Sequence, residues 1–428
     1  MKFSKFSRYL QKLEKTSLML EMTEILASLF EEAKSNEVRK VVYLSLGELA
    51  PLFRAVRFNI AGKTMAKIVV RACGESHERV LKLFRDKGDW GEVVETLSKK
   101  SKSRGGDLTI GEVYKRLLEI AEETGTGSQE RKISKFSDLL LSLDPLSAKY
   151  ATRISLGKLR LGFADKTVLD ALSWMAVGDK SLREPLERAY NVCPDIGLAA
   201  EVFKKEGPSG ISKLKIEVGR PLLPQLCQRA KTSAEVLERM GGETICEPKF
   251  DGERIQLHLD RNQTTFGFGG AERPDFLVKT FTRNLEDVSL MFPDLLEAAA
   301  RQIEAKSVIL DGEALGFNPR TGKFVPFQVT SRRRRKYGVR KVAEEIPLKF
   351  CVFDVLYKDG RSLLELPFVE RRRILEESID KGEVIDLTPQ RVLHKARELD
   401  RFLKEVLEKG LEGLVLKNPN SGYEAGGR

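Results

Sequence analysis

The residue pattern of this chain changes near residue 244, and that change constrains its fold more than any other feature. Before it, apolar residues recur at helical spacing, as Leu26, Leu29 and Phe30 do. After it, short apolar runs with Asp-Gly turns lie at 245–259, 308–317, 348–358 and 411–417, and helical stretches intervene at 285–304, 368–380 and 397–409. The sequence therefore predicts an all-α first half and an α+β second half.

The join between the two halves lies around residues 209–224. Pro208-Ser209-Gly210 and Arg220-Pro221-Leu222-Leu223-Pro224 both interrupt regular structure. We expect a multidomain chain with a helical domain at 1–212, a linker at 213–224 and an α+β domain at 225–428.

Composition excludes several classes of protein. Lys and Arg exceed Asp and Glu by 74 − 63 = 11, which favours a polyanionic partner but also fits a well-solvated surface. Five scattered cysteines without a Cys-x-x-Cys pair indicate free thiols, and three dispersed histidines are too few for a metal cluster. No run approaches the ~18 apolar residues of a membrane span, so we expect a cytoplasmic protein with no membrane association.

The stretch from Glu247 to Arg254 reads Glu-Pro-Lys-Phe-Asp-Gly-Glu-Arg between alternating apolar residues. That pattern predicts a strand, a tight turn and a second strand, with Lys249 at the end of the first. Lys249 can act as a nucleophile if its amine is partly neutral, which requires desolvation or a cationic neighbour such as Arg254. Alone, a lysine near an Asp-Gly turn is a weak signal.

Further segments follow Lys249 in a fixed order. They are Phe281-Thr282-Arg283, Leu310-Asp311-Gly312-Glu313, Val352-Phe353-Asp354-Val355-Leu356-Tyr357 and Glu412-Gly413-Leu414-Val415-Leu416-Lys417. In the first half, Gly157-Lys158-Leu159-Arg160-Leu161-Gly162 precedes Thr167-Val168-Leu169-Asp170-Ala171-Leu172. Over nearly its whole length the chain thus resembles the ATP-dependent DNA ligases of the archaeal and eukaryotic type, within the covalent nucleotidyltransferase superfamily.

The resemblance implies an ATP-grasp-like adenylylation domain that uses ATP and Mg²⁺ or Mn²⁺. Lys249 would carry AMP, Glu247 would contact the adenine and Phe353 would stack on it. The remaining implied nucleotide contacts are Arg254 and Arg283 at ribose, phosphate or the DNA end, Lys417 at a phosphate, and Arg428, for which no particular part of the nucleotide is implied. Glu313 and Glu412 would lie near ribose and metal, because hard oxygen donors match Mg²⁺.

From residue type alone, each of these positions also has an ordinary structural reading. Glu247 reads equally well as a surface glutamate at a strand edge, and Phe353 as a core residue of an apolar strand. Glu313 and Glu412 read as solvated residues at strand ends. The basic run Arg332–Lys336 is either a solvated helix start or a phosphate contact, and the sequence leaves both readings open.

The resemblance gives the helical half a role in holding nicked duplex DNA without reading its sequence. Basic residues around 157–170, among them Lys158, Arg160 and Lys166, and a basic helix start at 61–67 suit phosphate contacts. A sliding clamp is a candidate further partner, and we expect a monomer.

The chain ends at Arg428, where the family continues into a tryptophan, a lysine pair and an OB-fold domain. We therefore expect an incomplete DNA ligase of replication, repair and recombination that lacks the OB fold, binds nicked DNA and fails to complete sealing. The alternatives are a non-catalytic nick-binding fragment or another covalent nucleotidyltransferase of the RNA-ligase or capping type. An NAD-dependent ligase fits the first half less well.

Overall fold

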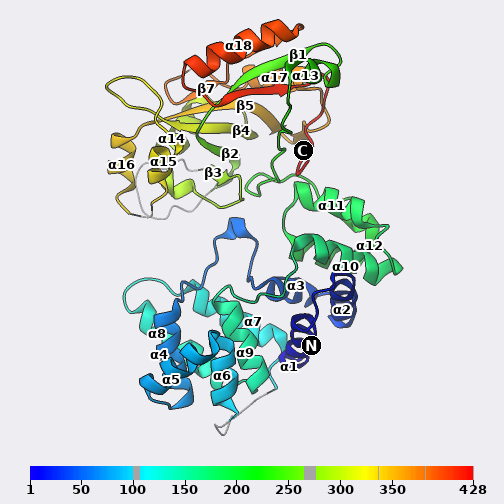
Figure 1. The fold of residues 1–428 in the computed structure, drawn as a ribbon, viewed down its shortest axis with the longest axis vertical. Helices are drawn as coiled ribbons and strands as arrows, with labels where there is room; N and C mark the ends of the chain where they lie inside the picture. The colour runs from blue at the N-terminus through cyan, green and yellow to red at the C-terminus, as the bar shows by residue number, and fades with distance from the viewer. Residues whose placement is uncertain (100–106, 265–275, 336, 381, 428) are drawn as a thin grey trace. The chain divides into compact units, whose positions relative to one another are not determined.

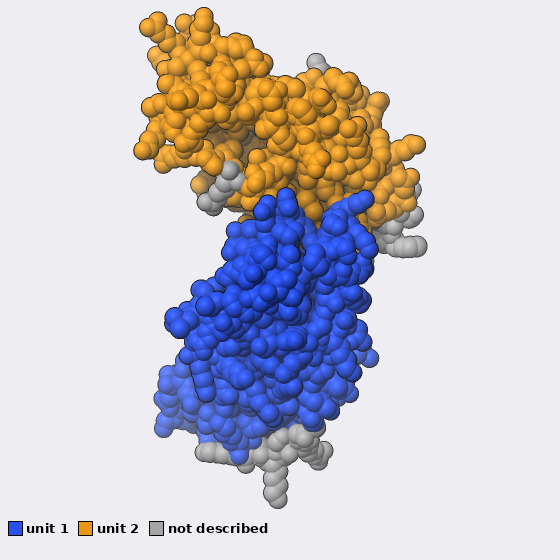
Figure 2. Space-filling model, turned by 90° about the vertical axis from the view of Figure 1, so that its right-hand side faces the viewer, with its two compact units in different colours: residues 1–190, 194–215 blue, residues 191–193, 216–428 orange. Residues whose placement is uncertain are grey.

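A computed structural model of the protein describes residues 1–99, 107–264, 276–335, 337–380 and 382–427. The chain forms two compact units, shown in Figures 1 and 2. The helical unit comprises Met1–Tyr190 and Pro194–Lys215, and the mixed unit comprises Asn191–Cys193 and Ile216–Arg428. The finer division at 212 and 225 stays a prediction.

The first unit is helical, as the sequence predicts. Its helices are α1 Phe3–Glu14, α2 Met19–Glu32, α3 Val38–Leu46, α4 Gly62–Cys73, α5 His77–Lys87, α6 Trp90–Ser98, α7 Ile110–Glu122, α8 Ser128–Leu141, α9 Pro145–Ser155, α10 Asp165–Val177, α11 Arg183–Val192 and α12 Ile196–Ile211, with the 3-10 turn η1 Leu52–Arg54. Local signals fix several helix starts. Thr109 and Glu112 form a capping box on α7, and Asp144 caps α9 directly before Pro145.

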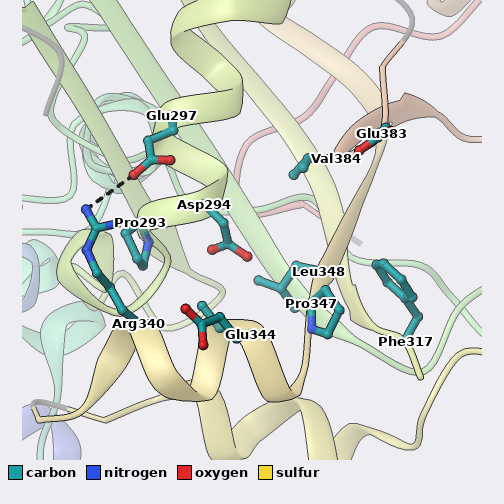
Figure 3. Close-up of a pocket in the computed structure, with 11 residues that line it drawn as sticks. Pro293, Asp294, Glu297, Phe317, Arg340, Glu344, Pro347, Leu348, Glu383 and Val384 are labelled. Carbon is teal, nitrogen blue, oxygen red and sulfur yellow. Dashed lines mark ion pairs between the residues drawn. The ribbon is translucent and has the colours of Figure 1, made fainter. Parts of the chain in front are cut away.

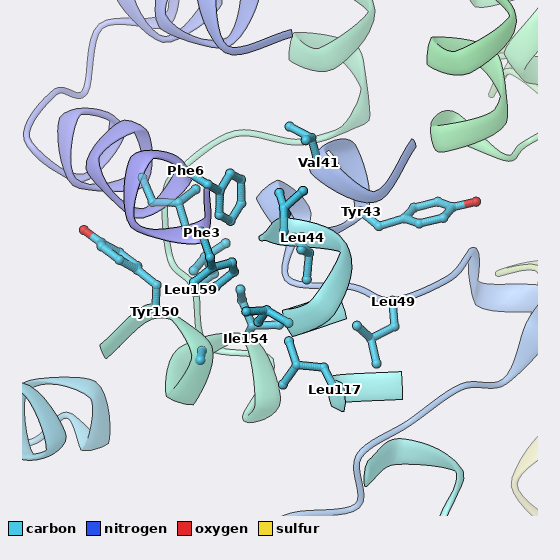
Figure 4. Close-up of a cluster of buried hydrophobic side chains, with 14 of the residues drawn as sticks. Phe3, Phe6, Val41, Tyr43, Leu44, Leu49, Leu117, Tyr150, Ile154 and Leu159 are labelled. Carbon is cyan, nitrogen blue, oxygen red and sulfur yellow. The ribbon is translucent and has the colours of Figure 1, made fainter. Parts of the chain in front are cut away.

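The core of the helical unit brings together helices that are far apart in the sequence (Figure 4). Phe3 and Phe6 of α1, Leu44 of α3 and Ile154 of α9 have no exposed surface. Burial of each such side chain contributes about 1.5–3 kcal/mol to the free energy of unfolding, because its apolar surface is removed from water. The unit therefore has a hydrophobic core of its own.

A charged network joins α1 to α9 beside this core. The Glu14 carboxylate accepts hydrogen bonds from Tyr150 Oη at 2.6 Å and Arg153 Nη1 at 2.8 Å, and Lys149 Nζ lies 3.1 Å from it. Partial burial raises the pKa of Glu14, but these hydrogen bonds outweigh burial and lower the pKa to about 2. The network therefore stabilises the charged form of Glu14.

The mixed unit contains two β-sheets. Its strands are β1 Thr244–Lys249, β2 Glu253–Thr264, β3 Phe276–Thr282, β4 Ser307–Gly316, β5 Leu348–Lys358, β6 Arg361–Ser362, β7 Ile385–Leu387, β8 Arg391–Leu393 and β9 Gly413–Lys417. Its helices are α13 Ser233–Arg239, α14 Pro293–Gln302, α15 Phe327–Thr330, α16 Val339–Glu345, α17 Phe368–Glu376 and α18 Ala396–Glu408, with 3-10 turns η2 Ser289–Met291 and η3 Ser331–Arg333. The smaller sheet has the order β8-β1-β9, and the larger has the order β3-β2-β4-β5-β6 with β7 parallel to β5. The α+β expectation is confirmed.

Both faces of the larger sheet are buried. One face packs on α14, where Leu295 and Ala299 join Leu310 in one core cluster. The opposite face carries Ile309, the neighbour of Leu310, in a second cluster with Leu222 of the segment that precedes β1. Successive strand residues point to opposite faces, so the apolar run in β4 serves both cores.

The Asp311-Gly312 dipeptide is not a turn, and that sequence prediction is wrong. β4 runs straight through it. A Cβ atom on Gly312 would lie 2.7 Å from the Phe350 ring and 2.8 Å from the Cys351 carbonyl oxygen. Glycine is needed here because β5 approaches closely, and Asp311 is thereby left inside a buried strand.

The basic run at 332–336 contains one buried residue, which neither reading of the sequence predicted, while Arg332 and Arg335 are exposed. The Arg333 side chain is fully buried and binds Asp294 through two hydrogen bonds, at 2.6 and 3.0 Å, and the Ile346 carbonyl oxygen at 2.8 Å. Arg333 is therefore a structural residue that joins η3 to α14. Arg334 pairs with Glu253 and Glu286, and Lys336 lies outside the described residues.

Two expectations drawn from composition can be compared with the structure. The five cysteines are free thiols, as expected. Among the described helices, none combines the length and the apolar character that crossing a membrane requires.

Replacing Glu14 with Gln should destabilise the helical unit in a pH-dependent way. The pKa of Glu14 in the folded chain lies below its ordinary value near 4.5, so its stabilising effect is complete above that pH and is lost as the pH falls towards 2. We expect a loss of about 1 kcal/mol at pH 7, discounted for partial exposure, and a smaller loss at pH 3.

Denaturant melts of both chains at the two pH values measure this difference, with Glu24→Gln on the exposed side of α2 as the control. An equal loss at pH 7 and pH 3 would contradict the prediction.

Candidate functional site

Lys249 lies at the end of β1, where the smaller sheet meets the turn into β2. β1 pairs antiparallel with β9, and Lys249 is opposite Gly413, so Glu412 comes directly beside it. The backbone N–H of Glu412 donates to the Lys249 carbonyl oxygen at 3.1 Å, and the two side chains form an ion pair. Both side chains are about half exposed, so the Lys249 ammonium is paired but reachable from solvent.

The Asp251-Gly252 turn after Lys249 packs tightly on β4. A Cβ atom on Gly252 would lie 2.6 Å from the Ala314 carbonyl oxygen, so only glycine fits without movement. Asp251 Oδ2 accepts a hydrogen bond from the Phe327 N–H at 3.2 Å. β1 and β2 belong to different sheets, and the turn therefore connects the two sheets instead of closing a hairpin.

Glu313 is the second carboxylate near Lys249. It lies in β4 opposite Arg254 of β2, and burial raises its pKa to about 7. The charges of Arg254 and Lys249 oppose this shift only in part. Glu313 is thus a largely buried carboxylate that would be stabilised by a further cation, and its reading as a solvated strand-end residue is wrong.

The donor atoms here suit a magnesium ion that binds together with phosphates. Within the described residues, no three His, Cys, Asp or Glu side chains gather as a metal-binding group. Mg²⁺ usually keeps several waters and is bound by one or two carboxylates plus substrate phosphates. Glu313 and Glu412 fit that pattern.

Arg254 is held by protein groups on several sides. Its Nε and Nη2 donate to the two carboxylate oxygens of Asp311 at 3.1 and 2.7 Å, and its Nη1 donates to the Gln225 carbonyl oxygen at 2.7 Å. The guanidinium carbon lies 5.4 Å from the centroid of the Phe353 ring. Burial disfavours the charge of Arg254, but the Asp311 carboxylate outweighs burial and raises the pKa of Arg254. The orientation of the Arg254 guanidinium group is therefore fixed before any ligand binds.

Glu247, Phe353 and Lys417 form a neighbouring group. Lys417 Nζ lies 2.9 Å from Glu247 Oε2 and donates to the Phe353 carbonyl oxygen at 3.0 Å, close to the Phe353 and Phe368 rings. Glu247 is only 2% exposed, so its reading as a surface residue is wrong. Burial raises the pKa of Glu247 although Lys417 opposes the shift. Phe353 remains partly exposed beside this pair.

The remaining predicted residues are less well placed. Arg283 is exposed just after β3 and forms no ion pair with any residue that the structure describes. Because Ile255 pairs with Thr282, Arg283 lies at the same end of the β2–β3 pair as Arg254. Arg428 lies outside the described residues.

Sequence reasoning assigned no role to Asp311 or Tyr423. The buried Asp311 carboxylate binds both Arg254 and the Tyr423 hydroxyl. The signal was present, because Asp311 is two residues before Glu313 and shares its strand face. Tyr423 gave no signal, since its partners are distant in the chain.

Basic residues in the helical unit lie where the sequence predicted them. Lys158 and Arg160 are exposed, and neither forms an ion pair with another described residue. Lys166 pairs with Glu187 at 2.9 Å. α4 begins at Gly62, so the basic segment 61–67 does form a helix start.

A cavity of about 290 Å³ in the mixed unit is separate from these groups (Figure 3). It lies between α14, α16 and the start of β5, and its lining includes Pro293, Glu297, Arg340, Glu344 and Glu383. None of the predicted site residues lines it. Its carboxylates also make it a poor site for a nucleotide phosphate.

Two family models match the chain. The model described as ATP dependent DNA ligase domain matches residues 224–428, and the model described as DNA ligase N terminus matches residues 2–173. Together they cover most of both units.

Similar proteins agree with these matches. A probable DNA ligase of Dictyoglomus turgidum is 40% identical over 426 residues, which cover 100% of this chain and 70% of that protein. DNA ligase 1 of Methanosarcina acetivorans is 38% identical over 435 residues, which cover 100% of this chain and 72% of that protein. A solved structure named Pmar-Lig_Pre. has the same fold, with a TM-score of 0.52 and 15% identity over 98% of this chain and 75% of that one.

The two domain models and the whole-length identity to DNA ligases, together with a lysine paired with Glu412 where β1 leads into the turn between two sheets, show that this chain belongs to the ATP-dependent DNA ligase family, whose members use ATP and act on nicked DNA.

Proposed function

We propose that this DNA ligase carries AMP on Lys249 while it seals 5′-phosphate/3′-hydroxyl nicks. The observation that carries the proposal is the ion pair between Lys249 and Glu412. Glu313 lies against the turn that follows Lys249, since a Cβ atom on Gly252 would be 2.9 Å from the Glu313 Cγ atom. Together the two carboxylates give the site the negative charge that a cation arriving with ATP would neutralise.

The first step is attack of the Lys249 amine on the α-phosphorus of ATP. An N–P bond forms, the P–O bond to pyrophosphate breaks, and the amine loses a proton. Negative charge builds on the phosphoryl oxygens, and Mg²⁺ bound by Glu313 and Glu412 would neutralise part of it. Lys249 is half exposed at a strand end, which leaves its amine free to reach the nucleotide.

The adenine would lie against Phe353, with Glu247 as its hydrogen-bond acceptor. Phe353 is partly exposed, so one face of its ring can stack on a base. Lys417 holds one oxygen of the buried Glu247 carboxylate at 2.9 Å, which fixes the orientation of the other oxygen. We propose that Lys417 orients Glu247 as well as contacting phosphate.

The next steps transfer AMP to the 5′-phosphate of the nick and displace it with the 3′-hydroxyl. Arg254 and the exposed Arg283 lie at the same end of the β2–β3 pair and are the proposed contacts for ribose, phosphate or the DNA end. Arg428 is a further proposed nucleotide contact. Sealing in replication, repair and recombination, a monomeric state and binding of a sliding clamp remain part of this proposal.

In the helical unit we propose nonspecific phosphate contacts from Lys158, Arg160 and the N-terminus of α4. The two exposed side chains have no partner among the described residues, and backbone N–H groups at a helix start attract phosphate. An RNA-ligase or capping activity is disfavoured, because the DNA ligase N terminus model matches this unit.

Lys249→Ala should abolish covalent labelling by radiolabelled ATP in the presence of Mg²⁺, because the alanine side chain cannot form the N–P bond. A denaturing gel of the labelled chain measures the product. Lys409→Ala, an exposed lysine after α18, should label as the wild type does. Undiminished label on Lys249→Ala would remove Lys249 from the proposed role.

Lys417→Met should leave Glu247 buried without its partner. We expect a loss of about 2 kcal/mol of stability, less than for a fully buried pair because Lys417 is 17% exposed, and about tenfold weaker ATP binding. Adding Glu247→Gln should restore much of the stability but not the ATP binding, since glutamine removes the unpaired charge.

Melting curves and ATP titrations measure both effects. The control is Lys404→Met, which removes an exposed lysine near Glu408 on α18. If Lys417→Met and Lys404→Met have the same melting temperature and the same affinity for ATP, the proposed role of Lys417 is contradicted.

Residues 1–212 alone should bind duplex DNA without sequence preference, with log affinity falling linearly as log salt rises. Replacing Lys158 and Arg160 with Gln should lower the magnitude of that slope by about 2, because each residue neutralises about one phosphate. The same change at Lys82 and Arg85 on α5 is the control. Fluorescence anisotropy at several salt concentrations measures the slope, and a flat salt response would remove the DNA-binding role.

A further inference from the structure

Two distant segments of the mixed unit lie side by side next to β2. The Gly426 N–H donates to the Leu223 carbonyl oxygen at 3.1 Å, and the Leu226 N–H donates to the Gly427 carbonyl oxygen at 2.9 Å. Leu222 and Tyr423 belong to the same apolar cluster on one face of the larger sheet. The segments 222–226 and 423–427 are thus joined to each other and to the sheet.

The Tyr423 hydroxyl is the buried polar group between these segments. It donates to Asp311 Oδ2 at 2.9 Å and accepts from the Gln225 N–H at 3.0 Å. Burial and the Asp311 charge hold the pKa of Tyr423 well above its ordinary value, so the hydroxyl stays a donor. It is therefore the partner that Asp311 and the Gln225 N–H share.

Arg254 closes a ring of hydrogen bonds around this hydroxyl. It binds both oxygens of Asp311 and the carbonyl oxygen of Gln225, whose N–H binds Tyr423. Asp311 is 1% exposed, so its carboxylate has little access to water and depends on these partners. The position of the Arg254 guanidinium is thereby determined by groups from three other chain segments, which are β4, 222–226 and 423–427.

The same guanidinium lies at the edge of the proposed nucleotide site. It is 5.4 Å from the centroid of the Phe353 ring, and Arg254 pairs with Glu313 across β2 and β4. A shift of the guanidinium would move the donor edge that faces a nucleotide stacked on Phe353. Small misplacements of such a donor reduce binding strongly because the geometry is no longer fixed in advance.

We propose that Tyr423 is a positioning residue that, through Asp311, orients Arg254 towards the ribose hydroxyls of ATP. This inference rests on the proposed function, because it requires the nucleotide to bind between Phe353 and Lys249. Arg254 Nη2 also donates to the Tyr423 hydroxyl, at 3.4 Å. Without the hydroxyl, Arg254 and the Gln225 N–H each lose an acceptor, and Asp311 keeps only Arg254. Arg254 can then reorient, and the contact with the ribose weakens while contacts with base and phosphates remain.

A matched control separates positioning from simple stabilisation. Tyr150 in the helical unit also buries a hydroxyl against a carboxylate, donating to Glu14 at 2.6 Å. Tyr150→Phe and Tyr423→Phe each remove one buried hydroxyl and keep the ring. Both variants should lose stability, but only Tyr423→Phe should change recognition of the ribose.

The test uses the 428-residue chain with ATP, 2′-deoxyATP and 3′-deoxyATP as probes. Dissociation constants and melting temperatures are measured for the wild type, Tyr423→Phe, Asp311→Asn and Tyr150→Phe. We expect Tyr423→Phe to weaken ATP binding about five- to tenfold and to leave the binding of one or both deoxynucleotides nearly unchanged. The ratio of the dissociation constant for the deoxynucleotide to that for ATP should therefore fall towards one. Asp311→Asn should reproduce that selective loss, and Tyr150→Phe should keep the wild-type preference.

A Tyr423→Phe chain that keeps the wild-type preference for ATP, whatever its melting temperature, overturns the inference. If Tyr423→Phe does not fold, Asp311→Asn decides in the same way. Failure of the proposed function would look different. In that case the wild type itself would bind no ATP, and the inference would fall with it. A wild type that binds ATP and both deoxynucleotides equally would overturn the inference alone, because AMP transfer through Lys249 does not require recognition of the ribose hydroxyls.

Discussion

The buried ion pair between Arg254 and Asp311 is the interaction on which the mixed unit depends. It links β2 to β4 inside the larger sheet, and Asp311 has almost no contact with water. Removing either partner of such a pair leaves a buried charge without compensation, which commonly costs about 3–5 kcal/mol. The segment before β1 and the segment after β9 both attach to this pair, through Gln225 and Tyr423. This one ion pair therefore stabilises the packing of β2 on β4, the attachment of the two connecting segments and one edge of the proposed nucleotide site.

The position of Lys249 follows from the way the two sheets are connected. β1 ends in the smaller sheet, the Asp251-Gly252 turn packs against β4, and β2 continues in the larger sheet. Lys249 therefore lies where residues of both sheets can reach it. Glu412 directly precedes β9, the strand that pairs with β1, while the partly buried Glu313 comes from β4. A reaction that builds negative charge on phosphoryl oxygens needs cations near them, and in the proposed function these two carboxylates would hold the Mg²⁺ that supplies that charge.

Sequence patterns predicted the parts of this structure that depend on local periodicity. The helical first half and most strand positions agree, because apolar spacing reflects burial on one or two faces. Patterns failed where long-range packing decides the outcome. Asp311-Gly312 looks like a turn but lies within β4, since the Phe350 ring leaves no room for a Cβ atom. The sequence context of Arg333 is typical of a surface residue, yet its side chain is buried, and its charge is compensated by Asp294, which is distant in the chain. Among the site residues, the sequence indicated Lys249, Glu313 and Glu412 by motif, but could not show that Arg254 binds Asp311 and Tyr423.

Apart from the exposed Arg283, the basic residues proposed to contact ligands are held differently in the two units. In the mixed unit, Arg254 and Lys417 are paired with carboxylates that are almost fully buried, so their positions are set before a small ligand arrives. Pairing of this kind fixes the position of the cationic group, but it reduces the net charge that attracts a ligand. In the helical unit, Lys158 and Arg160 are exposed and form no ion pair with another described residue, which suits a polyanion bound through release of its counterions. If the proposed contacts are right, salt should weaken duplex binding by the helical unit strongly and nucleotide binding in the mixed unit much less, since buried pairs are poorly screened.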